Sequence, residues 1–191
     1  MAEADKTRWN EKYLHHPIPE VPIKLVSSYA KLASGNRALD LACGMGRHSK
    51  FLASQGFEVD ALDISSLAIT SLQGFERIHA QEVDFDTYAL AKEKYDLIVC
   101  TYFLERKLFP QMIAALKPNG IMLYETFLNH NENQRTPSNP AFMLSEGELE
   151  AAFKVACEIV HVEAFWDDDY KGNKMRKISM VAKKRPQKEA Q

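Results

Sequence analysis

The stretch 37-RALDLACGMGRHS-49 decides the fold of this chain. Its first residues have the apolar character of a short buried strand, Gly44 and Gly46 mark a turn, and a helix can follow. A strand, a glycine turn and a helix in this order hold nucleotides in many unrelated proteins. Glycine lets the backbone approach a ligand closely, and the N-terminus of the next helix favours a negatively charged group. The stretch predicts a nucleotide-like ligand, although a dinucleotide pyrophosphate and an amino-acid carboxylate would both satisfy it.

Strands and helices alternate on the C-terminal side of this stretch. We predict strands over residues 37–42, 57–63, 77–83, 95–103, 121–127, 156–166 and 175–183, with helices over 47–55, 65–72 and 104–116. The nearly continuous apolar run 95-YDLIVCTYF-103 suits a central strand that is covered on both faces. The order predicts an α/β fold with a Rossmann-like, doubly wound sheet. This sheet is mostly parallel, has seven strands with the last one antiparallel, and carries helices on both faces.

Two helical segments precede the alternating region, at about residues 6–13 and 25–33. We therefore expect three parts in the chain. Residues 1–36 form an N-terminal helical cap, residues 37–184 form the ligand-binding domain, and residues 185–191 form a flexible tail. The tail is expected because the charged run 183-KKRPQKEAQ-191 is typical of a solvated segment.

Composition limits the classes of partner. The 191 residues are 46% hydrophobic and 26% charged, which is ordinary for one globular domain. The net charge of −2 gives no global positive field, so we expect no nucleic acid and no membrane partner. Three widely spaced cysteines without a C-x-x-C pair favour a reducing compartment over a disulfide framework or a zinc site. Without an apolar signal segment or a membrane-length run, we expect a soluble cytoplasmic protein.

Two aspartates at strand ends narrow the choice of ligand. Asp40 lies four residues before Gly44, where a carboxylate repels a pyrophosphate and attracts an ammonium group. Asp63 ends the next strand, 63 − 44 = 19 residues after the first glycine, which is the spacing of an acid that binds ribose hydroxyls. Ser49 stands where a dinucleotide turn has its third Gly or Ala. The pattern favours an adenosine ligand with an amino-acid end.

Five short motifs occur in order between about Arg37 and Phe127: D-L-A-C-G-M-G-R, V-D-A-L-D, V-D-F, Y-D-L-I-V and L-K-P-N-G. Their order and spacing resemble those of the class I S-adenosylmethionine-dependent methyltransferases of small-molecule type. The C-G-x-G-R turn, the short chain and 8-RWNEKY-13 also resemble the tellurite-resistance and thiopurine methyltransferase group, mainly over the first half of the chain. The resemblance implies S-adenosyl-L-methionine as cofactor and a small molecule as methyl acceptor.

The resemblance also implies which residues bind the cofactor. The implied residues are Asp40, Ala42, Cys43, Gly44, Gly46, Arg47, Asp63, Ile64, Asp84, Phe85, Thr101 and Tyr102. Asp40 and the turn 42-ACGMG-46 would hold the methionine part. Thr101 and Tyr102 end the fourth strand and would line the same part through backbone carbonyls. For Arg47, a contact with the cofactor's carboxylate and a plain helix-surface role are equally open.

The adenosine part would contact residues at the ends of the second and third strands. The resemblance implies that Asp63 holds the ribose, with Ile64 along one face of the adenine. It also implies that Asp84 accepts a hydrogen bond from the adenine amine, with Phe85 stacked beside the ring. Asp86 competes for the role of Asp84, because V-D-F-D offers two acids.

Candidates for the acceptor side lie near the same strand ends. Glu125, at the carboxyl end of the strand over residues 121–127, is the candidate general base and catalytic residue. Candidate substrate-binding residues are Trp9 and Tyr13 in the N-terminal helix, Arg106 after the fourth strand, and Arg135 in a long polar loop. Trp9 and Tyr13 are spaced to pack against each other, and a surface ion pair explains Arg106 equally well.

Two functions remain open at this point. The first is an enzyme that transfers a methyl group from S-adenosylmethionine to a small molecule. The second is a protein that binds S-adenosylmethionine as a sensor or as a non-catalytic partner subunit. We expect no metal site, because the contiguous Asp167, Asp168 and Asp169 lack the alternating spacing of a calcium loop and are typical of a solvated hairpin tip.

Overall fold

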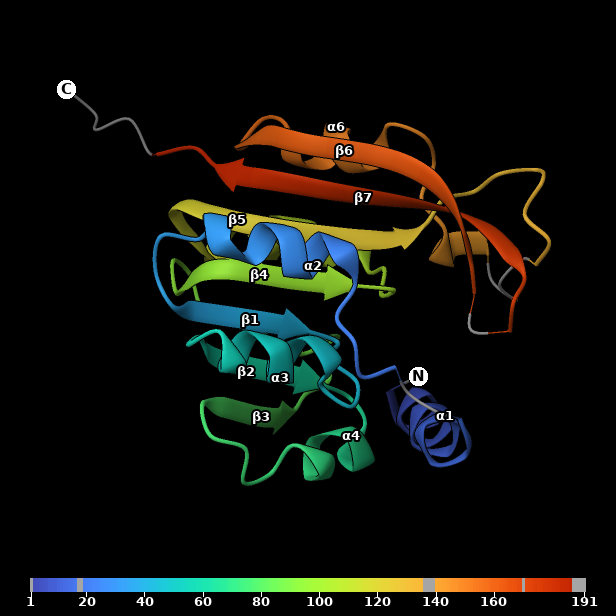
Figure 1. Cartoon of the computed structure of the whole chain (residues 1–191), viewed down its shortest axis with the longest axis horizontal. Helices are drawn as coiled ribbons and strands as arrows, with labels where there is room; N and C mark the ends of the chain where they lie inside the picture. The colour runs from blue at the N-terminus through green and yellow to red at the C-terminus, as the bar shows by residue number, and fades with distance from the viewer. Residues whose placement is uncertain (1, 17–18, 136–139, 170, 187–191) are drawn as a thin grey trace.

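The computed structural model describes residues 2–16, 19–135, 140–169 and 171–186, which include one seven-stranded sheet (Figure 1). The strands are β1 (Arg37–Leu41), β2 (Glu58–Asp63), β3 (Ile78–Glu82), β4 (Tyr95–Thr101), β5 (Leu116–Phe127), β6 (Cys157–Asp168) and β7 (Lys174–Lys184). Their order across the sheet is β3-β2-β1-β4-β5-β7-β6. Strands β1 to β5 pair in parallel, and β7 pairs antiparallel with both β5 and β6. The predicted mixed sheet with an antiparallel last strand is confirmed.

Helices cover both faces of the sheet, as predicted. They are α1 (Ala2–His15), α2 (Lys24–Tyr29), α3 (Arg47–Ser54), α4 (Ser66–Ser71), α5 (Phe109–Ala115) and α6 (Glu148–Phe153), with 3-10 turns η1 (Ala30–Leu32), η2 (Arg106–Leu108) and η3 (Pro140–Phe142). On one face, α2 and α3 lie across the strands in Figure 1. Alternate strand residues such as Leu97 and Ile121 pack there with Leu52 of α3. Their neighbours Ile98 and Met122 point to the opposite face and join the core under α5 and α6.

Two element boundaries differ from the sequence-based expectation. The helix predicted over residues 104–116 is divided into the 3-10 turn η2 and the helix α5, with Pro110 in the first turn of α5. Strand β5 begins at Leu116, but its register against β4 jumps from Leu116 to Ile121. The intervening L-K-P-N-G motif thus forms an irregular segment inside β5, where Asn119 has a left-handed φ of 65°.

The N-terminal helix is longer than predicted and lies at one edge of the sheet. Figure 1 places α1 beyond the arrowheads of β1, β2 and β3, which is the edge where parallel α/β sheets bind ligands. The three-part division of the chain into residues 1–36, 37–184 and 185–191 remains a prediction, and residues 187–191 of the tail lie outside the described residues. Among the described helices, none has the length and apolar character needed to span a membrane.

Candidate functional site

The glycine turn connects the end of β1 to the start of α3 through three left-handed residues. Ala42, Gly44 and Gly46 have φ values of 57°, 54° and 77°. Gly46 is the N-cap residue of α3, and a Cβ atom there would collide with the side chain of Leu72. Glycine at this position therefore allows both the backbone conformation and the close packing of the turn against the segment after α4.

Asp63 connects the glycine turn to the end of β2. Its carboxylate accepts hydrogen bonds from the backbone N–H of Gly44, at 2.8 Å, and of Ser65, at 2.9 Å. Burial raises the pKa of this carboxyl, and backbone hydrogen bonds from Ser65, Gly44 and Ile64 act in the opposite direction. A carboxylate offers about four acceptor positions, so these bonds leave capacity for a ligand hydroxyl. The side chain that sequence analysis assigned to the ribose thus also shapes the turn.

Asp40 lies in β1, just before the glycine turn, and is almost completely buried. Its side chain accepts a hydrogen bond of 2.6 Å from the Oγ of Ser49, in the first part of α3. Burial raises the pKa of Asp40 to about 7, while hydrogen bonds from Ser49 and the charge of Arg47 lower it. A buried carboxylate without a cationic partner is costly, and an ammonium group of a ligand would offset that cost.

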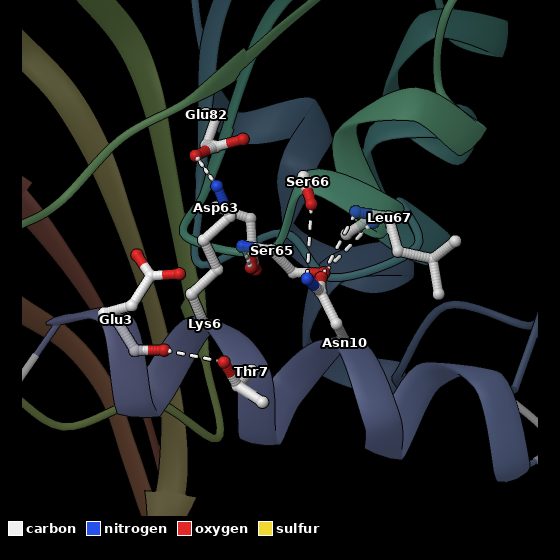
Figure 2. Close-up of polar contacts among 10 residues, drawn as sticks. Glu3, Lys6, Thr7, Asn10, Asp63, Ser65, Ser66, Leu67 and Glu82 are labelled. Carbon is white, nitrogen blue, oxygen red and sulfur yellow. Dashed lines mark hydrogen bonds and ion pairs between the residues drawn. The ribbon is translucent and has the colours of Figure 1, made fainter.

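Helix α1 is attached to the adjoining strand ends by the polar contacts shown in Figure 2. Asn10 accepts hydrogen bonds from the Oγ of Ser65, at 2.6 Å, and from the N–H of Leu67, at 3.2 Å, and it donates to Ser66. Ser65 is the N-cap residue of α4, so Asn10 binds a helix start whose N–H groups need acceptors. Lys6 adds an ion pair of 2.5 Å with Glu82, at the end of β3.

Helix α1 also brings Tyr13 onto the glycine turn. A Cβ atom built on Gly44 would lie 2.9 Å from the Tyr13 hydroxyl, which shows how closely the phenol covers the turn. Burial raises the pKa of Tyr13, and the charge of Asp63 acts in the same direction. The Trp9 ring lies 5.6 Å from the Tyr13 ring, and Lys12 lies over the indole. Tyr13 therefore faces the predicted cofactor position, whereas Trp9 makes the packing contact that its spacing also predicted.

We expect the Asn10→Ala variant to loosen α1 and to weaken ligand binding at the glycine turn. It removes the acceptor for Ser65 and Leu67, at a cost of about 1–2 kcal/mol, while the backbone of the helix is retained. Hydrogen exchange of residues 2–16 should accelerate, and the Kd for S-adenosylhomocysteine should rise about fivefold to tenfold. The matched control is Thr7→Ala, because the Thr7 hydroxyl donates to the carbonyl of Glu3 within α1. Equal exchange rates in wild type and Asn10→Ala would contradict the attachment role.

A second group of side chains lies at the ends of β4 and β5. The N–H of Tyr102 donates to the carbonyl of Glu125, at 2.7 Å, and its hydroxyl donates to Oε1 of the same residue, at 2.7 Å. Glu125 is only 5% exposed. Burial raises the pKa of Glu125, while the Tyr102 hydrogen bond and the charge of Lys177 lower it. The candidate base is therefore held beside a phenol within a sheltered strand end.

Two cations lie against the Tyr102 ring. The guanidinium of Arg47 lies 5.9 Å from its centroid and the Nζ of Lys177 lies 5.2 Å from it. Lys177 is 4% exposed and donates to Oδ2 of Asp167, at 2.7 Å, and to the carbonyl of Asp168, at 3.0 Å. Lys177 was not among the site residues predicted from the sequence. Its position in the sequence could have indicated the site, because Lys177 lies near the start of the antiparallel last strand. The first residues of such a strand lie beside the C-terminal end of β5, where Lys177 pairs with Phe127.

His48 is a structural residue of this edge. It is 3% exposed, its Nε2 lies 3.5 Å from the N–H of Ile23, and its Nδ1 lies 3.4 Å from the hydroxyl of Thr101. Burial lowers the pKa of His48 to about 3, with the charge of Arg47 acting in the same direction. The imidazole is therefore neutral at physiological pH and serves to connect α3, the segment before α2, and β4.

Comparison with known proteins places this arrangement in a family. The model of the tellurite resistance protein TehB family matches residues 5–180. The chain belongs to the TehB family. Among curated relatives, the ubiquinone biosynthesis O-methyltransferase of Burkholderia multivorans is 34% identical over 131 residues, which are 61% of this chain and 54% of the relative. The chain thus spans about half the length of that relative.

Solved structures share the fold of this TehB family member. TehB from Haemophilus influenzae aligns with a TM-score of 0.72 and 24% identity, over 94% of this chain and 67% of that one. An S-adenosylmethionine-dependent methyltransferase from Methanosarcina mazei aligns with a TM-score of 0.70 and 19% identity, over 87% of this chain and all of that one, at 100%. The chain is a member of the S-adenosylmethionine-dependent methyltransferases, and the predicted class and cofactor are confirmed.

Within this TehB family member, the predicted adenine residues have different surroundings. The Asp84 carboxylate accepts from the N–H of Asp86, at 2.9 Å, and is half-buried. Asp86 is exposed and forms an ion pair with Lys107. The Phe85 ring is buried in the core, 5.3 Å from the ring of Phe103. Phe85 therefore packs inward against Phe103, and Asp84 is the less exposed of the two acids. The adenine contacts expected of Asp84 or Asp86 and of Phe85 remain predictions.

Both predicted acceptor-side arginines contact other parts of the chain. Arg106 donates to Glu148, at 2.5 Å, and to the carbonyls of Ala141 and Met143. Arg106 thus forms the ion pair that was the alternative to a substrate role, and its partner is Glu148. Arg135 donates to Asp169, at 3.2 Å. These bonds fasten the segment around residues 140–148 and the β6–β7 hairpin, so a substrate role is not supported for either arginine by these contacts.

Proposed function

We propose that this protein transfers the methyl group of S-adenosylmethionine to a small-molecule acceptor by in-line displacement. The observation that carries the proposal is the pairing of two groups at one sheet edge. The glycine turn with Asp40 and Asp63 lies at the ends of β1 and β2, and the Tyr102–Glu125 pair lies at the ends of β4 and β5. Arg47 links the two groups, because it belongs to α3 and contacts the Tyr102 ring.

The residues of the turn fit the cofactor. Asp40 would bind its ammonium group, Asp63 a ribose hydroxyl, and Asp84 the adenine amine. The remaining cofactor contacts that we propose are Ala42, Cys43, Gly44, Gly46, Arg47, Ile64, the backbone of Phe85, Thr101 and Tyr102. Tyr13 would close the site from α1, in keeping with a cap over residues 1–36. S-adenosylmethionine, when bound, supplies an electrophilic methyl group on a sulfonium. The chain's own contribution is to align the acceptor with that group and to exclude water.

The proposal of a small acceptor rests on the relatives and on the charge of the chain. The curated relative from Burkholderia multivorans is an O-methyltransferase. The net charge of −2 provides no extended positive surface for a nucleic acid. Three buried free thiols, at Cys43, Cys100 and Cys157, agree with a cytoplasmic location.

Calorimetry followed by a transfer screen tests the proposed function. The full chain is first titrated with S-adenosylmethionine and with S-adenosylhomocysteine. It is then incubated with tritiated-methyl cofactor and a panel of phenols, thiols, chalcogen oxyanions and small carboxylic acids. Transfer to any member of the panel supports the proposal. Cofactor binding without transfer to any acceptor would favour the sensor or partner-subunit alternative, and a failure to bind either form would contradict both functions.

We expect Asp84→Asn to weaken cofactor binding and Asp86→Asn to leave it unchanged. A hydrogen bond from the adenine amine to an ionised carboxylate is stronger than one to an amide, so the Kd should rise about fivefold to tenfold for Asp84→Asn. Asp86 already pairs with Lys107 on the surface, and its replacement should change the Kd by less than about twofold. Titration of both variants with S-adenosylhomocysteine measures the difference. A larger effect at Asp86 would reverse the assignment.

A further inference from the structure

Tyr102 has an unusual backbone conformation for an aromatic residue. Its φ is 56°, in the left-handed region that bulky side chains rarely adopt. Both ends of the residue are held by Glu125, whose carbonyl accepts from the Tyr102 N–H and whose carboxylate accepts from its hydroxyl, each at 2.7 Å. Residues that are held in such rarely populated conformations are concentrated at functional sites, so the Tyr102 side chain is a candidate for a functional role.

The surroundings of Tyr102 keep its hydroxyl protonated, because burial and the charge of Glu125 both raise its pKa. Arg47 and Lys177 contact its ring, and the Phe127 ring lies 5.6 Å away on the side of β5. The residue is partly exposed, whereas its partner Glu125 is buried. The Tyr102 hydroxyl therefore contacts a buried carboxylate, while part of the residue is accessible to solvent and hence to an acceptor.

Tyr124 shows what a purely structural tyrosine looks like at a neighbouring position. It is completely buried, and its hydroxyl donates to the backbone carbonyl of Phe103, at 2.7 Å. A carbonyl cannot take up a proton, so that bond serves packing alone. Tyr102 differs in both respects, because it is partly exposed and donates to an ionisable group, and it also has a left-handed backbone.

We propose that Tyr102 and Glu125 form a proton relay that deprotonates a hydroxyl acceptor during methyl transfer. The proposal rests on the proposed function and names its acceptor class as a protic oxygen, such as a phenol. It gives Tyr102 a catalytic side chain in addition to the backbone contact with the cofactor.

The relay balances protons and electrons in one step. The acceptor oxygen forms a bond to the methyl carbon, and the carbon–sulfur bond breaks with its electron pair going to sulfur. The acceptor's proton moves to the Oη of Tyr102, while the proton of Tyr102 moves to Oε1 of Glu125. The products are the methyl ether, S-adenosylhomocysteine and a protonated Glu125, which then releases its proton to solvent. Arg47 and Lys177 favour the ionised form of Glu125 that accepts the proton, because their charges lower its pKa.

Two acceptors of different acidity test the relay. Catechol keeps its protons at pH 8 and needs a base, whereas 4-nitrocatechol is already ionised at that pH and needs none. We expect Tyr102→Phe and Glu125→Gln each to lower kcat for catechol about 100-fold and to change kcat for 4-nitrocatechol less than threefold. The double variant should be no slower than either single variant, because both remove one relay. Tyr124→Phe, the control, should retain both rates.

The pH profile gives an independent measurement of the relay. For catechol, kcat of the wild type should rise through an apparent pKa above the ordinary glutamate value, and Glu125→Gln should lose this limb. The groups that face Glu125 are Tyr102, Arg47, Lys177 and Asp167, so their charges shape the profile.

Two other outcomes would overturn the relay while leaving the proposed function intact. Equal losses for the two catechols would assign Tyr102 and Glu125 to positioning only. Transfer to a thiol or an oxyanion with none to either catechol would overturn the relay while the proposed function stands. S-adenosylhomocysteine titration and thermal unfolding of each variant show that the cofactor site and the fold are intact, and a variant that fails either check is replaced by Tyr102→Leu or Glu125→Met.

Discussion

Replacing Asp40 by asparagine is expected to stabilise the cofactor-free protein at pH 8 and to weaken binding of S-adenosylmethionine. Asparagine has nearly the same volume and still accepts the hydrogen bond from Ser49. It lacks the charge, and Asp40 is 1% exposed, so the variant avoids the cost of an ionised group in the protein interior. Function and stability therefore oppose each other at this residue.

The effect on stability has a defined pH window. Burial raises the pKa of Asp40 from 3.8 to about 7 in the folded protein. The unfolded chain loses this proton near pH 4, and the folded protein retains it up to about pH 7, so unfolding releases a proton between these values. The contribution of Asp40 to the free energy of unfolding therefore falls across this window, by about 4 kcal/mol in the limiting case, and the difference between wild type and Asp40→Asn isolates it from the opposite contribution of His48. Below pH 4 wild type and Asp40→Asn should be equally stable, and at pH 8 the variant should unfold at a clearly higher temperature.

Binding should change in the opposite direction. If Asp40 holds the cofactor's ammonium group, affinity of the wild type rises as pH increases through about 7, and Asp40→Asn loses about tenfold to 100-fold at pH 8. Thermal unfolding from pH 4 to pH 9 and calorimetric titration at pH 6 and pH 8 measure both effects. The matched control is Asp60→Asn. Burial raises the pKa of Asp60, but contacts with Lys94 and Tyr95 outweigh it and lower the pKa overall, so this control should destabilise the protein at pH 8. A difference in stability between wild type and Asp40→Asn that stays constant between pH 4 and pH 8 would contradict the assignment.

Most of the fold could be predicted from sequence because its signals are local. The alternation of strands and helices and the apolar run over residues 95–103 depend on neighbours in the chain, and the structure confirms them. The start of β5 depends on its pairing with β4, where Tyr95 opposes Leu116 and Leu97 opposes Ile121. This register shift has no signature in the P-N-G turn itself, which also fits a simple helix end.

The candidate site was predictable where topology alone brings residues together. The carboxyl ends of parallel strands share one edge, so Asp63, Thr101 and Glu125 were expected near the glycine turn, and the structure places them there. Asn10 and Lys177 were missed, because their roles depend on how α1 and the last hairpin dock. The contacts of Arg106 could not be predicted for the same reason, because they depend on how a distant segment docks. Glu148 lies 42 positions after Arg106, and no spacing rule connects a loop arginine to a partner so distant.

Replacing Asp63 by alanine is expected to have the largest combined effect on binding and stability. Two buried backbone donors, the N–H groups of Gly44 and Ser65, lose their acceptor. Hydrogen bonds to a charged group are worth about 1.5–3 kcal/mol each, but the cost of burying the Asp63 carboxylate, which raises its pKa, offsets part of this, so we expect a net loss of about 1–3 kcal/mol of folding free energy. Loss of the proposed ribose contact should weaken S-adenosylhomocysteine binding by about 1–3 kcal/mol, and disorder of the glycine turn should weaken it further.

Two further variants separate the parts of this prediction. Asp63→Asn keeps the shape of the side chain, and its amide oxygen can accept from one N–H. Its amide nitrogen is a donor and cannot accept from the other N–H. We therefore expect the stability and the affinity of Asp63→Asn to lie between those of wild type and Asp63→Ala. Glu82→Gln is the matched control, because Glu82 is the register neighbour of Asp63 on β3 and contacts Lys6 without touching the turn. It should keep the Kd within about threefold. Thermal unfolding with and without S-adenosylhomocysteine gives both quantities. If Asp63→Ala lowers the unfolding temperature but retains wild-type affinity, Asp63 supports the turn alone and the ribose contact must come from another residue.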